Sequence, residues 1–107
     1  MNSLRFAALA FVVAVTPPSG GLAAATHHVV VIAQMKFGAL PAKLHVGDTI
    51  SWVNRDLFRH SATARDGSFD IDLPAGKSGT IMLRKPGTIA FACKYHPGMT
   101  GMLRVAK

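Results

Sequence analysis

Three side chains with metal-binding chemistry follow one another closely near the carboxyl end of this 107-residue chain. Cys93 is the only cysteine, His96 comes three residues later, and Met99 three residues after that. A thiolate, a neutral imidazole and a weak axial thioether suit a mononuclear copper ion that has one more histidine ligand. His60, upstream in the sequence, can supply that imidazole. The pattern therefore raises the hypothesis that these four side chains bind one copper ion.

Each of these residues also has a plainer interpretation. A lone cysteine on an inward strand face is usually a small buried hydrophobe, and His60 alone could be a core histidine. Met102 competes with Met99 for the axial position, but its alternation with Leu103 predicts that Met102 faces outward. Zinc can occupy the same ligands, because it takes tetrahedral sets of nitrogen and sulfur. The combined spacing favours copper over these alternatives.

The amino-terminal residues predict an exported protein. Arg5 provides a short positive region, residues 6–15 form an unbroken apolar run, and alanines at 23–25 suit cleavage. The run is too short to span a bilayer, which takes about 20 residues, and we expect no membrane span elsewhere. We therefore expect a signal peptide at residues 1–25 and one small domain at residues 26–107.

The domain at residues 26–107 is basic. Of the 12 lysines and arginines only Arg5 precedes it, and all 5 acidic residues lie inside it, so its net charge is about +6. The cations are scattered, whereas nucleic-acid sites gather them on one face, so we expect an acidic protein partner and no nucleic acid. Asp66, Asp70 and Asp72 lack the spacing of a calcium loop, and we expect them on a polar outer strand face.

Apolar residues recur with a period of two throughout this domain, between turn signals such as Pro86-Gly87. Such alternation is typical of strands and predicts an all-β fold, a small antiparallel Greek-key β-sandwich. Cys93 continues the inward series of Ile89 and Phe91, so its sulfur should point into the sandwich at the end of a strand. Trp52 is expected in the core.

Longer stretches of the domain resemble the cupredoxins, the blue copper proteins, and among them amicyanin and its short-loop relatives. The resemblance rests on residues 35–37, 44–54, 60, 85–88 and 91–99. Its specific part is the combination of Val-Gly-Asp-Thr-Ile-x-Trp-x-Asn, the histidine that follows it, and then Cys-x2-His-x2-Met. It implies that His60, Cys93 and His96 are strong equatorial ligands and Met99 a weak axial one. It also implies one copper ion that cycles between Cu(I) and Cu(II) in a soluble one-electron carrier of the bacterial periplasm.

Three positions depart from the family pattern. Ser61 replaces an asparagine that often follows the first histidine and ties the two ligand loops together, and Arg59 and Tyr95 stand where proline often precedes a ligand histidine. These changes affect the rigidity of the site and its reduction potential rather than its ligands. Ser61 is the candidate hydrogen-bond donor to the Cys93 sulfur.

Two classes of function fit these residues. The first is a monomeric electron carrier that docks transiently on a dehydrogenase, an oxidase or a cytochrome, and the second is a periplasmic copper-binding protein for delivery or buffering. A saturated site with a buried histidine favours the carrier. An enzyme is not expected, because the short chain offers no second copper centre and no open coordination position.

Four residues outside the main motif bear on these alternatives. His27 and His28 lie close to the expected mature amino terminus, where a free amine and a histidine can bind Cu(II), although an ordinary first strand is the simpler interpretation. Arg59 and Lys94 neighbour two predicted ligands and are expected to surround the electron exit with positive charge, which would attract an acidic partner surface.

Overall fold

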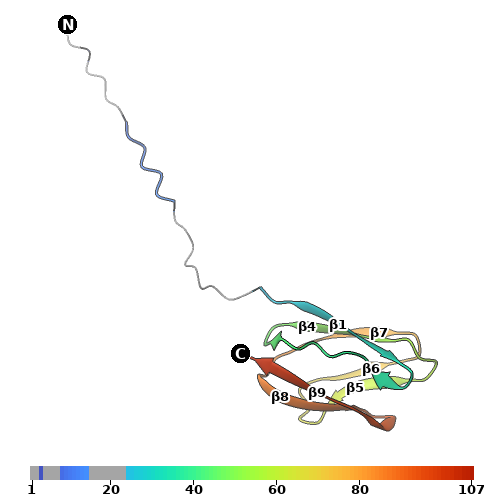
Figure 1. Cartoon of the computed structure of the whole chain (residues 1–107). Helices are drawn as coiled ribbons and strands as arrows, with labels where there is room; N and C mark the ends of the chain where they lie inside the picture. The colour runs from blue at the N-terminus through green and yellow to red at the C-terminus, as the bar shows by residue number, and fades with distance from the viewer. Residues whose placement is uncertain (1–2, 4–7, 15–23) are drawn as a thin grey trace.

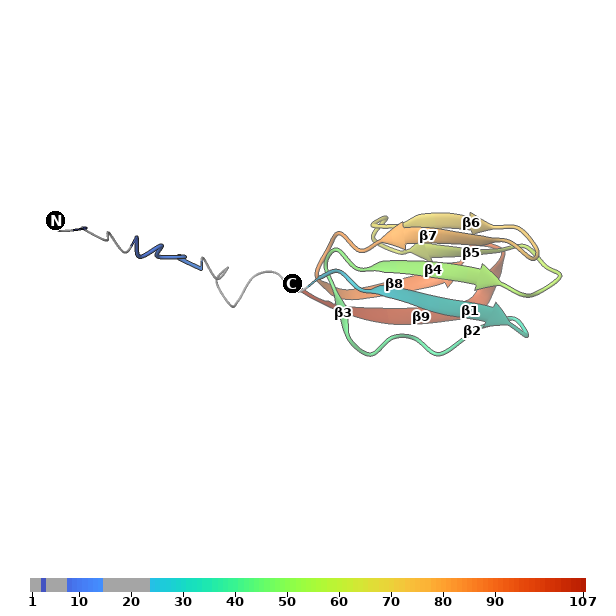
Figure 2. The same cartoon turned by 90° about the horizontal axis from the view of Figure 1, so that it is seen from above.

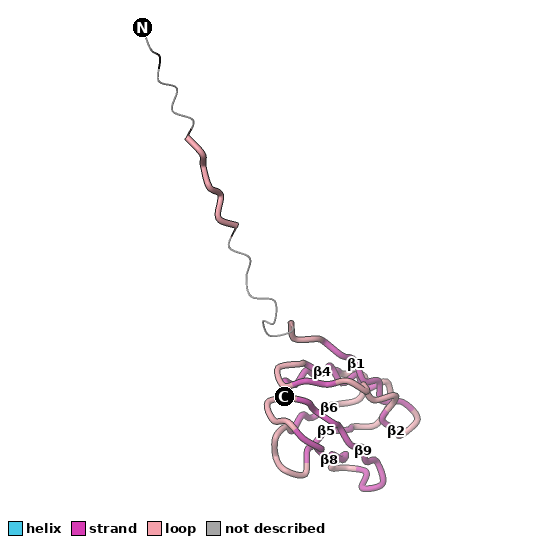
Figure 3. The backbone as a smooth tube through the Cα atoms, turned by 60° about the vertical axis from the view of Figure 1, so that its left-hand side comes forward, coloured by secondary structure: helices cyan, strands magenta, loops and turns pink. Residues whose placement is uncertain are grey.

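The alternating segments form strands that pack as two sheets (Figure 1). The computed structural model describes residues 3, 8–14 and 24–107. Within these residues the strands are β1 (His27–Ala33), β2 (Lys36–Phe37), β3 (Leu44–His45), β4 (Thr49–Asn54), β5 (His60–Ala64), β6 (Asp70–Leu73), β7 (Ser78–Met82), β8 (Gly87–Cys93) and β9 (His96–Ala106). No helix occurs among them, as Figure 3 shows, which confirms the all-β prediction.

The two sheets have strand orders β2-β1-β4-β7 and β3-β9-β8-β5-β6. Most neighbouring strands are antiparallel, as predicted. The exceptions are β1 with β4 and β3 with β9, which pair in parallel. The β1–β4 pair is parallel because the chain leaves β1, contributes β3 to the other sheet and then returns to the first sheet as β4, running in the direction of β1. Hydrophobic alternation identifies the inward face of a strand but not the direction of its neighbour.

The core lies between the sheets and is built from the inward residues of each strand. Trp52 is fully buried, as predicted, and its ring packs edge-on against Phe91 with ring centroids 5.2 Å apart. Phe37 contacts Phe91 in the same manner, at 4.8 Å. Opposite Phe91 stands Gly101, where a Cβ atom would collide with the Phe91 ring. Aromatic packing of this density fixes β8 and β9 relative to the first sheet.

The two ends of the sandwich differ in what they hold. Figure 2 shows the start of β1 and the carboxyl terminus at one end, while β8 ends and β9 begins at the other. The short turn between β8 and β9, with a shift of register between Ala92 and Cys93, therefore places the cysteine motif at the end remote from the termini.

The predicted signal peptide, residues 1–25, falls mostly outside the described residues. Residues 3, 8–14, 24 and 25, which are described, belong to no helix or strand. Within the described part of the chain, no helix has the length and apolar character needed to cross a membrane.

Candidate metal centre

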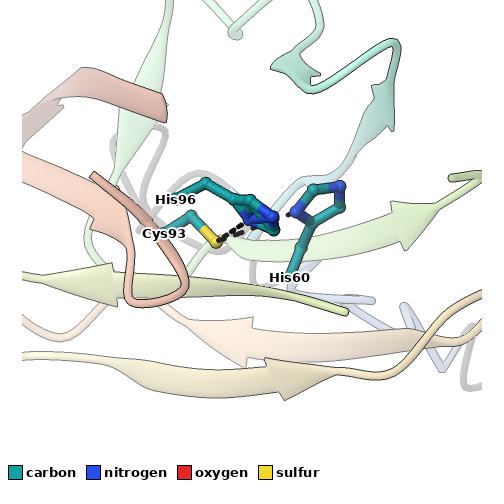
Figure 4. Close-up of side chains that lie close together, drawn as sticks. All are labelled: His60, Cys93 and His96. Carbon is teal, nitrogen blue, oxygen red and sulfur yellow. Dashed lines mark hydrogen bonds between the residues drawn. The ribbon is translucent and has the colours of Figure 1, made fainter. Parts of the chain in front are cut away.

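Three of the four predicted ligands meet at the remote end of the sandwich (Figure 4). His60 begins β5 and is fully buried, Cys93 ends β8 and is 2% exposed, and His96 begins β9 and is half-buried. Their ligand atoms all lie within 4.8 Å of one another, and in the described part of the chain no other such group of three histidine, cysteine or acidic side chains occurs. Residues 33 positions apart in the sequence thus converge on one point, because β5 and β8 are adjacent in the second sheet.

The distances between these atoms fit a bound metal ion. Cys93 Sγ lies 3.8 Å from His60 Nδ1 and 3.9 Å from His96 Nδ1. With metal–nitrogen bonds of about 2.0 Å and metal–sulfur bonds of about 2.3 Å, a bond angle near 120° separates nitrogen from sulfur by about 3.7 Å. The two sulfur–nitrogen distances therefore match a trigonal arrangement, which is the geometry that copper adopts with two histidines and one cysteine.

The two methionines near this end have different environments. Met99 lies in β9, is 6% exposed and belongs to the buried core, whereas Met102 is 51% exposed. The outward orientation predicted for Met102 from its alternation with Leu103 is confirmed. Met99 thus remains the candidate for an axial thioether.

A carboxylate holds the second nitrogen of His60. Asp56 Oδ2 lies 2.8 Å from His60 Nε2 and accepts its N–H. Burial favours a raised pKa for Asp56, but the bonds from His60 and from the backbone N–H groups of Met35 and Gln34 outweigh it, so this pKa lies below its ordinary value. The carboxylate therefore stays ionised, places the proton of His60 on Nε2 and leaves the Nδ1 lone pair free toward Cys93.

A closed ring of hydrogen bonds holds the residue that follows Cys93. The Lys94 backbone N–H donates to Ser61 Oγ at 2.8 Å, and Ser61 and Thr63 hydroxyls lie 2.9 Å apart. Thr63 donates to Asp70 at 2.9 Å, and the Lys94 ammonium donates to the other oxygen of Asp70 at 2.7 Å. Because the Thr63 proton is used by Asp70, Ser61 must donate to Thr63.

This ring corrects the expected role of Ser61. Its single proton is committed to Thr63, so Ser61 does not donate to the Cys93 sulfur as the sequence suggested. It instead joins β5 to the segment after β8 through Lys94, which is the tying role that family members often give to asparagine. Ser61 is fully buried, so this link is shielded from water.

Exposed apolar side chains lie near His96 in space or in sequence. The Phe58 ring lies 6.4 Å from the His96 ring, and Leu57, Phe58 and Tyr95 are 92%, 59% and 46% exposed. Pro97 is also exposed. We call Leu57, Phe58, Tyr95 and Pro97 the apolar rim. An exposed cluster of this kind is a typical contact surface.

The cations expected to charge this end are paired with carboxylates. Arg59 lies 2.6 Å from Asp72, and Lys94 lies 2.7 Å from Asp70. Tyr95 also donates its hydroxyl proton to Asp72, at 2.9 Å. Each predicted positive charge is therefore offset locally. Asp70 and Asp72 lie on the exposed face of β6 as expected, whereas Asp66 lies in the turn between β5 and β6, where it pairs with Lys85.

Comparison with known proteins assigns the chain to a family. The model of the Cupredoxin-like domain matches residues 5–105. The chain belongs to this family. Similar solved structures include amicyanin from Paracoccus versutus, with a TM-score of 0.62 and 25% identity over 74% of this chain and 80% of that chain. A methionine-to-alanine variant of amicyanin in its Cu(I) form gives a TM-score of 0.61 and 28% identity, over 74% of this chain and 81% of that one. A search of curated protein sequences gives no match.

Sequence reasoning did not find two of the residues that support the site. Asp56 lies in the loop between β4 and β5, where no periodicity applies, although its position four residues before His60 was a usable signal. Thr63 lies in β5, where the alternation of apolar residues gives it no role. Both act through hydrogen bonds whose partners come from other strands.

Proposed function

We propose that this protein is a periplasmic one-electron carrier with a type 1 copper site formed by His60, Cys93, His96 and Met99. Membership of the cupredoxin family and similarity to amicyanins support a copper electron carrier. The observation that carries the ligand assignment is the spacing of Cys93 Sγ from the two Nδ1 atoms, 3.8 and 3.9 Å. Soft sulfur and imidazole ligands suit copper in both oxidation states.

The copper ion would supply the redox chemistry, and the residues of the chain keep its surroundings constant. Asp56 fixes the ring of His60, and the ring of hydrogen bonds through Ser61 fixes the backbone after Cys93. His60 and Cys93 are 0% and 2% exposed, so water does not reach them. Because the ligands come from β5, β8 and β9, a change of copper charge meets a frame that resists rearrangement. Electron transfer is slow when the coordination sphere must rearrange, so a frame that keeps the ligands in nearly the same geometry favours a carrier.

The apolar rim provides a place for a redox partner. Of the proposed ligands His96 is the half-buried one; the Phe58 ring lies 6.4 Å from its ring, and the exposed Tyr95 and Pro97 are its neighbours in the sequence. We expect the electron to pass through the edge of the His96 ring to a dehydrogenase, an oxidase or a cytochrome. The positive net charge of the domain favours a partner with an acidic surface. Because Arg59 and Lys94 are paired with Asp72 and Asp70, the attraction comes from the charge of the whole domain rather than from these two residues alone.

Substitution of the ligands tests this function. Purified domain loaded with copper should be blue through charge transfer from thiolate to Cu(II), and should bleach reversibly on one-electron reduction. Cys93→Ser should abolish the colour, and His60→Ala or His96→Ala should abolish or distort it. His45→Ala is the matched control, since His45 is exposed at the opposite end of the sandwich and should leave the spectrum unchanged. A blue Cys93→Ser protein would refute the ligand assignment.

The same copper-loaded protein distinguishes an electron carrier from a protein that delivers or buffers copper. Burial of His60 and Cys93 favours slow release of the metal, whereas delivery requires accessible ligands. A pale protein that passes copper readily to a chelator would favour delivery.

Salt dependence tests the acidic partner. Electron transfer to the physiological partner should slow as salt rises, because charges are screened beyond about 8 Å at physiological ionic strength. Lys94→Glu or Arg59→Glu should slow it further at low salt with the colour intact. A rate indifferent to salt and to both substitutions would show that docking is apolar.

A further inference from the structure

A buried carboxylate lies beside the first residue of the predicted mature domain, at the end opposite the metal centre. Asp48 is 2% exposed. Its Oδ1 accepts the backbone N–H of Thr26 at 2.9 Å, and its Oδ2 accepts the backbone N–H of His45 at 3.0 Å. Three formal or potential cations surround it. His28 Nε2 lies 3.0 Å from Oδ2, and His45 Nδ1 lies 4.0 Å from the same oxygen. Lys107 lines a cavity of about 210 Å³ that Asp48 and His45 also line.

Thr26 is also where the fold begins. Its carbonyl accepts the Thr49 N–H at 3.1 Å, and β1 starts at the next residue. Ala24 and Ala25 are exposed and belong to no strand. The peptide bond between Ala25 and Thr26 therefore separates residues without regular structure from the first residue held by the sandwich.

We propose that export processing cuts the chain between Ala25 and Thr26, and that Asp48 is the receptor for the α-ammonium group released there. An endopeptidase of the export machinery would add water across the Ala25–Thr26 peptide bond. The C–N bond breaks, the Ala25 carbonyl carbon takes the oxygen of the water and becomes a carboxylate, and the Thr26 nitrogen takes both protons of the water and becomes an ammonium group. A neutral N–H donor to Asp48 is thereby replaced by a cation at the same position.

This replacement strengthens the contact for a physical reason. A buried carboxylate is costly unless it is paired with charge and hydrogen-bonded. The Thr26 N–H is the largest influence that lowers the pKa of Asp48, which lies at about 2 against an ordinary 3.8, so the carboxylate is ionised at neutral pH. Hydrogen bonds to charged donors are about twice as strong as neutral ones. Cleavage one residue earlier would place the cation at Ala25, about 3.8 Å further along the backbone, with no such partner.

The same geometry argues against a copper site at the amino terminus. Binding of Cu(II) through the amine would remove the Thr26 nitrogen from Asp48. It would also disturb His28, which donates to Asp48, and His27, whose ring nitrogens lie 2.6 Å from Thr49 Oγ1 and 3.2 Å from Ser51 Oγ. Both histidines are paired in β1 with β4. The amine and His28 are thus used by the fold.

Two measurements test the proposal, and neither depends on the copper site. The mass of the exported protein should correspond to a chain that starts at Thr26, and any other start would overturn the cleavage assignment. The second measurement compares the thermal unfolding of the chain starting at Thr26 with that of a chain retaining Ala24-Ala25, each with Asp48 and with Asp48→Asn. Retaining the two alanines should lower Tm by about 4–8 °C when Asp48 is present, a shift expected for a stabilising interaction in a domain of this size.

In the Asp48→Asn protein, retaining Ala24-Ala25 should change Tm little, because the carboxylate that would receive the α-ammonium group is absent. An equal loss of Tm in both backgrounds would overturn the pairing. If Asp48→Asn does not fold, titration of the α-amine in the unsubstituted protein decides the question. Its pKa should exceed the ordinary range of about 7.7–8.0, and a value in or below that range, or Cu(II) binding through the amine at neutral pH, would contradict the proposal.

Discussion

Replacement of Ser61 by alanine tests how much the link between β5 and the segment after β8 contributes. The Ser61 hydroxyl is fully buried and accepts the Lys94 backbone N–H. Alanine removes this acceptor and leaves a shielded N–H without a partner. An unsatisfied buried donor costs about 1–3 kcal/mol.

The expected loss of stability is therefore about 2 kcal/mol. In a domain of roughly 80 residues each kcal/mol lowers Tm by about 4–8 °C, so Ser61→Ala should melt roughly 8–16 °C below the unsubstituted protein. Thermal and urea unfolding of the copper-free protein measure this loss without any contribution from metal binding. The copper-loaded variant should show a changed reduction potential, because Cys93 is no longer held through Lys94.

Ser78→Ala is the control for this substitution. Ser78 lies at the start of β7 and is exposed, and its hydroxyl makes no hydrogen bond with any residue that the structure describes. Surface substitutions of this kind change stability by less than about 0.5 kcal/mol. If Ser61→Ala is as mild as Ser78→Ala, the hydrogen-bonded ring is not a structural link, and the account given for Ser61 is wrong.

Three further results are expected. Met99→Gln should lower the reduction potential, since a harder oxygen donor favours Cu(II), while the same change at exposed Met102 should have little effect in a voltammetric measurement; a larger change at Met102 would overturn the axial assignment. Copper-free protein should melt below copper-loaded protein in calorimetry, because a ligand that binds only the folded state stabilises it, and equal melting temperatures would contradict a folded-state site. Gly101→Ala should destabilise the fold by roughly 1–3 kcal/mol in urea unfolding, because its Cβ would overlap the Phe91 ring, and a neutral result would mean that this ring moves freely.

The sequence was most informative where one physical rule decides the outcome. Alternation predicts the inward sulfur of Cys93, the buried Trp52 and the exposed Met102, because side chains on a strand alternate between two faces. It could not predict that β1 pairs in parallel with β4, since pairing direction depends on the path of the chain between the sheets.

The supporting hydrogen bonds were beyond prediction for a related reason. The sequence suggested Ser61 as a donor to sulfur, but its proton goes to Thr63, and this depends on Thr63 being bonded to Asp70 of the neighbouring strand. The positive charge expected from Arg59 and Lys94 is offset for the same reason, because Asp70 and Asp72 come from β6. To predict contacts of this kind, one must know the register in which β5 pairs with β6.

The turn between β1 and β2 limits how far this metal centre could be transplanted. Gln34 and Met35 adopt positive φ angles of 52° and 60°, unusual for residues other than glycine, and in this conformation both backbone N–H groups point to the Asp56 carboxylate that holds His60. Grafting the segment from Cys93 to Met99 onto another β-sandwich would carry over three of the proposed ligands but not the orientation of the fourth, His60. A designer who wants the complete site must graft a hairpin about 60 residues away in sequence as well.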